Sequence, residues 1–144
     1  MKEMLPVDDY LIQRGRMKLV QAILDVDENG ATARSVTSAA WPLFKNGSIS
    51  PLVIIELVAQ TAGINVRWEE TRLSGSPPGE GKGGGFIVGV KDAVFHVPAI
   101  AVPETVITHS GRKYMYLNYA EYHGVSKIGD CTLGEVVLQI VRTE

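Results

Sequence analysis

The longest apolar stretch of the chain lies at residues 51–68, where Glu56 is the single carboxylate. Apolar side chains would fall on nearly every side of a helix here, which predicts a helix over about residues 51–72 that the rest of the fold encloses. Ser50 suits the N-cap of this helix and Pro51 its first position. Because an unpaired carboxylate is costly to bury, we expect Glu56 to be paired, neutral or open to a pocket.

The rest of the chain follows patterns typical of strands and tight turns. Residues 5–14 indicate a short N-terminal helix or turn. Strands are predicted at residues 17–25 and 31–37, joined by the Asn29-Gly30 signal of a tight hairpin. After the helix, four more strands are predicted, at residues 86–95, 104–110, 113–123 and 132–142. This order predicts an α+β fold in which a sheet curls around one enclosed helix.

Two segments lack such a pattern. Residues 38–50 form an irregular approach to the helix and contain the turn signal Asn46-Gly47. Residues 74–85 are rich in glycine and have no apolar side chain to anchor them, which predicts a mobile loop. This loop does not match a phosphate-binding P-loop, because Lys82 is followed by glycine instead of serine or threonine.

The composition is that of one globular domain over residues 1–144, with 45% hydrophobic residues and a net charge of −2. This charge gives no sign of a nucleic-acid partner. Polar residues within the predicted helix exclude a membrane span, and no signal peptide is visible, so we expect a cytoplasmic protein. The single cysteine, Cys131, excludes an intrachain disulfide and lacks the spacing of a metal site. Neither a metal nor another cofactor is expected.

The helix segment also carries a family resemblance. Residues 51–60, Pro-Leu-Val-Ile-Ile-Glu-Leu-Val-Ala-Gln, resemble the motif that opens the central helix of the hotdog-fold 3-hydroxyacyl-(acyl carrier protein) dehydratases. Residues 11–20, 89–98 and 134–142 resemble other parts of the same family, so the resemblance covers most of the chain. It implies a hotdog fold, an antiparallel sheet of about six strands around the helix. It also implies a homodimer or higher even oligomer with its sites at the subunit interface.

The departures from the family concern its chemistry. Those dehydratases carry a catalytic His in a Gly-His-Phe-Pro motif ahead of the helix, whereas residues 41–47 of this chain contain no His. Gln13 stands at the position of the family's opening His, and Leu52 at that of the Gly at the helix start. A divergent branch without the catalytic His is more similar, through Val58-Ala-Gln-Thr61.

The resemblance implies an acyl-thioester ligand on acyl carrier protein or coenzyme A, in fatty-acid or polyketide-type metabolism. Dehydration of a 3-hydroxyacyl thioester needs a base at C2, an acid for the leaving hydroxyl and donors to the carbonyl. Glu56 is the candidate acid, and Gln60, one turn along the same helix face, is the candidate residue that orients it. The substrate-binding candidates are Asn46, Gly89 and the backbone amides of Leu52 and Val53 at the helix start.

Three functions remain open at this stage. The first is a dehydratase-type enzyme. The second is a thioesterase, in which Glu56 alone activates water or attacks the carbonyl. The third is a non-catalytic subunit that binds the thioester and pairs with an active partner. No base for dehydration is evident, because His96, His109 and His123 lie in the later strands. A purely structural Glu56, paired inside the fold, also stays open.

Overall fold

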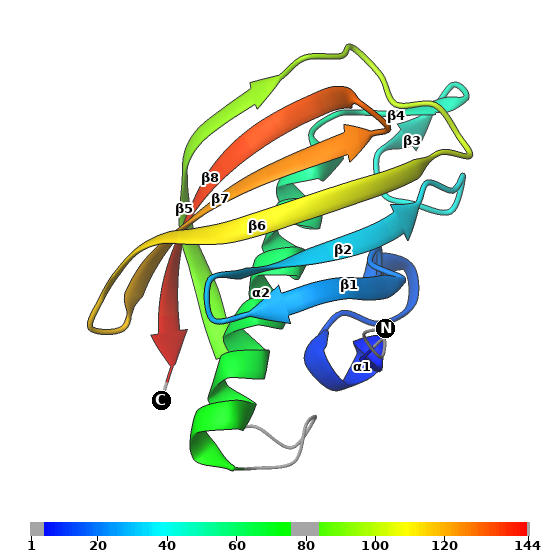
Figure 1. Ribbon diagram of the computed structural model, residues 1–144. Helices are drawn as coiled ribbons and strands as arrows, with labels where there is room; N and C mark the ends of the chain where they lie inside the picture. Colours follow the sequence, from blue (N-terminus) through cyan, green and yellow to red (C-terminus); the bar gives the residue numbers. More distant parts are fainter. Residues whose placement is uncertain (1–4, 76–83, 144) are drawn as a thin grey trace.

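A six-stranded antiparallel sheet curls around one long helix in the computed structural model, which describes residues 5–75 and 84–143 (Figure 1). The strand order is β1-β2-β6-β7-β8-β5. This arrangement confirms the predicted α+β architecture. The central helix α2 spans Val53–Ser74, and the sheet consists of β1 (Ala22–Asp27), β2 (Gly30–Val36), β5 (Gly84–Phe95), β6 (Thr105–Tyr116), β7 (Tyr119–Ile128) and β8 (Cys131–Thr143).

Smaller elements precede the central helix. They are helix α1 (Val7–Tyr10), the 3-10 turn η1 (Gly15–Met17) and the hairpin of β3 (Phe44–Lys45) with β4 (Ser48–Ile49). This hairpin turns at Asn46 and Gly47, whose φ angles are 55° and 85°, so the predicted Asn-Gly turn is confirmed. The predicted mobile loop falls mainly on residues 76–83, which lie outside the described residues. Within the described ranges, no helix has the length and hydropathy of a membrane span.

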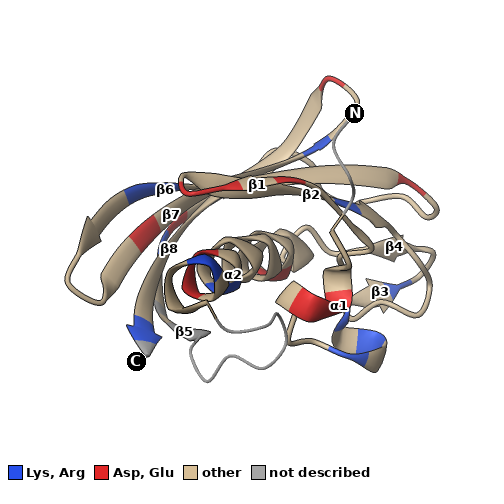
Figure 2. Cartoon of the chain, turned by 60° about the horizontal axis from the view of Figure 1, so that its bottom comes forward, with Lys and Arg blue, Asp and Glu red and all other residues tan. Residues whose placement is uncertain are grey.

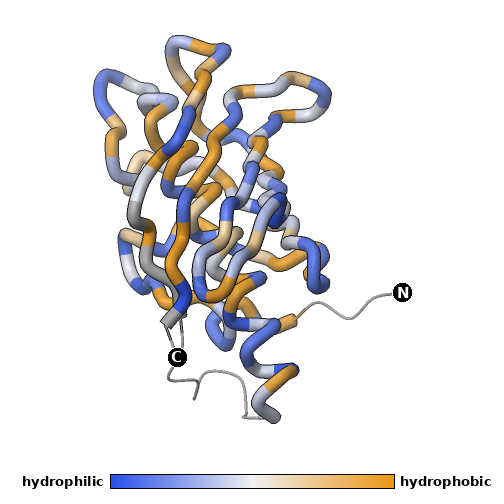
Figure 3. The backbone as a smooth tube through the Cα atoms, turned by 90° about the vertical axis from the view of Figure 1, so that its left-hand side faces the viewer, coloured by the Kyte–Doolittle hydropathy of each residue, from blue (hydrophilic) through white to orange (hydrophobic). Residues whose placement is uncertain are grey.

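Alternation along the strands places one face of the sheet against the helix. Figure 3 shows this alternation as changes of colour along the strands. The inward-facing side chains pack on Leu57 and Val58 of α2 in the main core. Strand β7 is the clearest case, since its buried residues are Ala120, Tyr122, Gly124 and Ser126. Gly124 allows a close approach of the helix, because a Cβ there would collide with the side chain of Val58.

The strands predicted at residues 104–110 and 113–123 require a turn between them, and this prediction is wrong. Strand β6 continues to Tyr116, and the chain reverses at residues 117–118. Gly111 pairs with Gly30 of β2 on one side and with β7 on the other. A Cβ at Gly30 would come within 2.9 Å of the Cα of Gly111, so the two glycines mark a close approach of strands instead of a turn. Sheet hydrogen bonds on both sides keep the segment extended, and the β6–β7 hairpin therefore projects from the body of the fold (Figure 1).

Helix α2 is less enclosed than the sequence pattern predicts. Its sheet-facing side is buried, but a stripe of Glu56, Ala59, Gly63 and Arg67 is only half-buried. Figure 2 looks along the helix and shows the curled sheet on one side and α1 on another. The stripe combines small residues with charged ones, so it offers little apolar surface for other segments to cover. The helix begins at Val53, slightly later than predicted.

Candidate functional site

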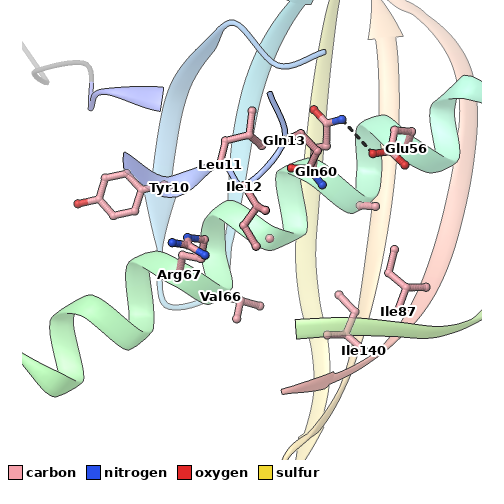
Figure 4. A pocket seen from close by; sticks show the side chains of 12 residues that line it. Tyr10, Leu11, Ile12, Gln13, Glu56, Gln60, Val66, Arg67, Ile87 and Ile140 are labelled. Atoms are coloured by element: carbon pink, nitrogen blue, oxygen red, sulfur yellow. Dashed lines mark hydrogen bonds between the residues drawn. The ribbon is translucent and has the colours of Figure 1, made fainter. Parts of the chain in front are cut away.

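A cavity of about 110 Å³ lies along the half-buried stripe of helix α2. The helix forms its floor, and its walls come from residues 10–13 and from two strands, through Ile87 of β5 and Ile140 of β8 (Figure 4). Glu56 lies toward one end of the cavity and Arg67 toward the other, with mainly apolar residues between them. A concave, mainly apolar site with a few polar groups is typical of small-molecule binding.

Gln60 joins the floor of the cavity to the segment that precedes β1. Its Oε1 accepts hydrogen bonds from the amides of Leu19 and Val20, at 3.1 and 3.2 Å. Its Nε2 donates to the carbonyl oxygen of Met17 at 2.6 Å and to Oε1 of Glu56 at 3.0 Å. Both polar groups of Gln60 are therefore occupied, and the amide nitrogen holds the Glu56 carboxylate in place.

Glu56 is half-buried and lines the cavity. The bond from Gln60 reaches one of its carboxylate oxygens (Figure 4), and the other has no hydrogen-bond partner among the described residues. A proton-transfer group needs this combination of a fixed orientation and an oxygen free to reach a ligand. The sequence spacing that placed Glu56 and Gln60 on one helix face agrees with this geometry.

Gly63 leaves the middle of the cavity floor open. A Cβ at this position would have no heavy atom within 4 Å. Glycine inside a helix costs about 1 kcal/mol relative to alanine, and here no close packing contact requires it. The absent side chain thus adds space to the cavity between Glu56 and Arg67.

The predicted substrate-binding residues lie elsewhere. Asn46 is exposed at the tip of the β3–β4 hairpin. Gly89 of β5 faces a side chain of β8. The amides of Leu52 and Val53 both donate to Ser50, at 3.3 Å to its Oγ and 3.1 Å to its carbonyl oxygen. None of these four residues is among the described residues that line the cavity, and their contacts with a ligand stay predictions.

Three polar residues of the cavity, Tyr10, Gln13 and Arg67, were not among the sequence candidates. A signal existed for two of them. Gln13 occupies the position of the opening His in the resembling family, and Arg67 falls about three helical turns from Glu56 on the same stripe. No such signal marks Tyr10, which is buried, and burial raises the pKa of its hydroxyl.

The three histidines do not line this cavity in the described part of the chain. His109 Nδ1 lies 2.8 Å from the hydroxyl of Thr32, and His96 Nε2 lies 3.0 Å from a carboxylate oxygen of Glu135. His123 is exposed. No group of three or more His, Cys, Asp or Glu side chains within the described ranges could hold a metal ion.

A second polar cluster ties the later part of α2 to the sheet. The buried Glu69 carboxylate accepts hydrogen bonds from Arg112 at 2.8 Å and Arg142 at 3.0 Å. One turn earlier, Asn65 accepts a hydrogen bond from the hydroxyl of Tyr122. Burial raises the pKa of Tyr122 to about 12. These groups satisfy one another, which is the usual arrangement of a structural network.

Comparison with known proteins shows which family and which solved structures this chain is similar to. The family model of the ApeP-like proteins, described as ApeP dehydratase, matches residues 5–143. A chain of the dehydratase heterocomplex ApeI:P from Xenorhabdus doucetiae has a TM-score of 0.83 at 19% identity, over 97% of this chain and 92% of that one. A sigma28-regulated virulence protein from Campylobacter jejuni has a TM-score of 0.69 at 16% identity, over 96% of this chain and 97% of that one.

A hypothetical thioesterase from Streptococcus pneumoniae, solved with coenzyme A, has a TM-score of 0.66 at 8% identity, over 84% of each chain. At these identities, the solved structures show the shared hotdog fold alone. A search of curated proteins found no match. The family match runs from just before α1 to the end of β8. This chain therefore belongs to the ApeP-like dehydratase family.

Proposed function

We propose that this chain is a subunit of a dehydratase that acts on 3-hydroxyacyl thioesters, with Glu56 as its proton-transfer group. The observation that carries the proposal is the Glu56 carboxylate, held 3.0 Å from the Gln60 amide beside a mainly apolar cavity. Apolar walls suit an acyl chain, and membership of the ApeP-like dehydratase family supports the reaction class. Acyl carrier protein or coenzyme A would present the thioester.

The reaction requires two proton-transfer roles. A base takes the proton from C2, the C3–O bond breaks, and water leaves as the C2–C3 double bond forms. In the role of the acid, Glu56 would supply the proton that turns the leaving hydroxyl into water. Among the described residues of the cavity, Glu56 is the only carboxylate and no histidine is present. We therefore infer that the base comes from a second subunit.

Strand β5 is where a second subunit can reach the cavity. It forms one edge of the sheet, and its residue Ile87 lines the cavity. A partner strand paired on this edge would stand beside the Glu56 site. The similar chain from Xenorhabdus doucetiae was solved in the dehydratase heterocomplex ApeI:P, which supports a partner of different sequence. The homodimer stays a prediction from the sequence.

Thioester hydrolysis is the second candidate, because a single carboxylate can serve it without a base from a partner. Glu56 would then activate a water that attacks the thioester carbonyl, releasing a carboxylic acid and a free thiol. The similarity to the hypothetical thioesterase solved with coenzyme A supports the same ligand class. In the third candidate function, this chain only binds the thioester and the partner subunit carries out all of the chemistry.

One assay separates these functions. The full chain is incubated with 3-hydroxyacyl, enoyl and saturated acyl thioesters, both alone and mixed with an ApeI-type subunit, that is, a protein like the other component of the ApeI:P heterocomplex. The proposal predicts dehydration and hydration by the mixture, and loss of both with Glu56→Gln, which is nearly isosteric but cannot transfer the proton. Release of free thiol would instead favour hydrolysis. Turnover by Glu56→Gln at the wild-type rate would remove Glu56 from the mechanism.

A further inference from the structure

Arg67 extends the candidate site far beyond Glu56. The two residues are about three helical turns apart, so they project from nearly the same side of α2 with about 16 Å of helix axis between them. Both line the same cavity, and Figure 4 shows Arg67 beside Tyr10 at the end away from Glu56. A ligand that contacts both side chains would lie lengthwise along the helix.

The space between these two charged groups fits an extended ligand. Between the charged ends, the helix lines the floor with Ala59, Gln60, Gly63 and Val66, and the open space over Gly63 leaves room above the helix. Ile87 and Ile140 supply apolar walls from β5 and β8. The described cavity therefore runs from a carboxylate, along a mainly apolar floor, to a guanidinium.

Arg67 lacks the partner that other half-buried arginines of this protein have. Arg112 and Arg142 both bind the Glu69 carboxylate. In the described part of the chain, no carboxylate lies within 4.0 Å of Arg67, although Glu70 attracts it electrostatically. Its side chain is half-buried at the cavity. A guanidinium in this position is suited to bind an anion through charge-assisted hydrogen bonds.

We propose that Arg67 binds an anionic group of the acyl-thioester ligand, at the end of the cavity opposite Glu56. This inference rests on the proposed function and assigns it a specificity-determining residue. Two parts of such a ligand carry suitable anions. One is a carboxylate at the far end of the acyl chain, and the other is the phosphate of the pantetheine carrier. The two are distinguished by separate ligands in the test.

The test compares three thioether analogues, which can be neither dehydrated nor hydrolysed, by calorimetric titration of the full chain, alone and mixed with an ApeI-type subunit. The first is a thioether of N-acetylcysteamine with a neutral alkyl chain in place of the acyl group, the second has the same chain with a terminal carboxylate, and the third is the thioether of phosphopantetheine with the neutral chain. We expect one of the two anionic analogues to bind about tenfold more tightly than the neutral one, the gain of one charge-assisted hydrogen bond. The analogue with the higher affinity identifies the anion that Arg67 binds.

Arg67→Met removes the charge but keeps an apolar stem, so it should lose this tenfold gain and keep the affinity for the neutral analogue. Arg67→Lys keeps the charge and should keep part of the gain. Arg72→Met is the matched control, because Arg72 is an exposed arginine of the same helix that pairs with Glu28 outside the described cavity lining. It should bind all three analogues like the wild type.

Two results would overturn the assignment of Arg67 alone. In the first, the neutral analogue binds and neither anionic analogue binds more tightly than it does. In the second, Arg67→Met still binds an anionic analogue about tenfold more tightly than the neutral one. If the wild type binds none of the three analogues, either alone or mixed with an ApeI-type subunit, the proposed function itself fails, and the assignment fails with it. The neutral analogue thus tells the two failures apart.

Discussion

At the scale of single residues, Gln60 has two tasks, which substitutions at Gln60 and at Glu56 separate. It holds the Glu56 carboxylate, and it satisfies the buried backbone groups of Leu19, Val20 and Met17. Gln60→Leu would leave these backbone groups unpaired, which we expect to lower the free energy of unfolding by about 2–4 kcal/mol. Urea unfolding followed by circular dichroism measures the change. Glu56→Gln is the control and should unfold close to the wild type.

A Gln60→Leu protein that unfolds at the wild-type urea concentration would show that these bonds contribute little to stability. The comparison also bears on the structural reading of Glu56. If Glu56 only served the fold, Glu56→Gln would shift unfolding and the loss of activity would follow from it. The proposed function requires activity to fall while the unfolding midpoint stays in place.

Tyr122 predicts a pH dependence of stability. Burial raises the pKa of its hydroxyl from 10.0 to about 12. Between these two pH values, the Tyr122 hydroxyl has lost its proton in the unfolded chain and keeps it in the folded chain. The contribution of this group to the free energy of unfolding is therefore fully present below pH 10 and is lost as the pH rises through about 12. By about pH 12 the loss should reach roughly 2–3 kcal/mol. Urea unfolding of the wild type and of Tyr122→Phe at several pH values measures it.

In Tyr122→Phe this alkaline loss should be smaller, because the substituted side chain has no proton to lose. The variant also lacks the hydrogen bond to Asn65, so its stability at neutral pH should be lower by about 1 kcal/mol. Tyr116→Phe, at an exposed position, is the control and should follow the wild type. Equal alkaline losses in Tyr122→Phe and the wild type would contradict the prediction.

At the scale of elements, alanine substitutions at two glycines should change the free energy of unfolding in opposite directions. A Cβ at Gly63 of α2 meets no atom within 4 Å, whereas a Cβ at Gly124 of β7 collides with Val58. Gly63→Ala should therefore raise the free energy of unfolding by about 0.5–1 kcal/mol through helix propensity, while its methyl group narrows the cavity and weakens ligand binding. Thermal unfolding and the calorimetric titration measure the two effects.

Gly124→Ala is the matched comparison, because the same methyl group enters a filled space. Overpacking at this contact should lower stability by about 1–3 kcal/mol. Gly63→Ala would contradict the cavity assignment if it bound thioester analogues as tightly as the wild type. A stable Gly124→Ala would mean that the helix and β7 can separate without cost.

The elements also show which parts of the fold and of the site sequence patterns can predict. The long apolar helix and the Asn46-Gly47 turn are local signals, and both were predicted because neighbouring residues alone specify them. The turn near Gly111 was predicted wrongly, since the pairing of this glycine with strand β2 is a tertiary contact. In the site, the Glu56–Gln60 pair follows from helix spacing. The three hydrogen bonds of Gln60 to distant backbone groups could not be foreseen.

At the scale of the whole molecule, the cavity unites segments that are far apart in the chain. Residues 10–13, helix α2, Ile87 and Ile140 meet only because the sheet curls and brings β5 beside β8. Periodicity within one segment carries no information about such a meeting. The wall made by Ile87 also places the cavity next to an edge strand, so the completeness of the site depends on what pairs with β5.

This dependence leads to a prediction about assembly. Val90 and Val94 are exposed on β5, at 44% and 45% of their surface, and they would stand close to a strand paired on this edge. Val90→Lys with Val94→Lys should prevent that pairing, because lysines on an edge strand oppose strand addition and repel each other across a symmetric dimer. Light scattering of the 15.6 kDa chain, alone and mixed with an ApeI-type subunit, measures the assembly.

Two controls separate this effect from a general effect of charge or hydrophobicity. Val90→Thr with Val94→Thr keeps the β-branched shape without charge and should assemble like the wild type. Leu24→Lys adds charge to β1, which forms the opposite edge of the sheet, and should also assemble normally. If the lysine variant still assembled, β5 would not be the interface. If it were monomeric yet catalysed dehydration at the wild-type rate, the base would have to lie within this chain, because no partner strand would then stand beside Glu56.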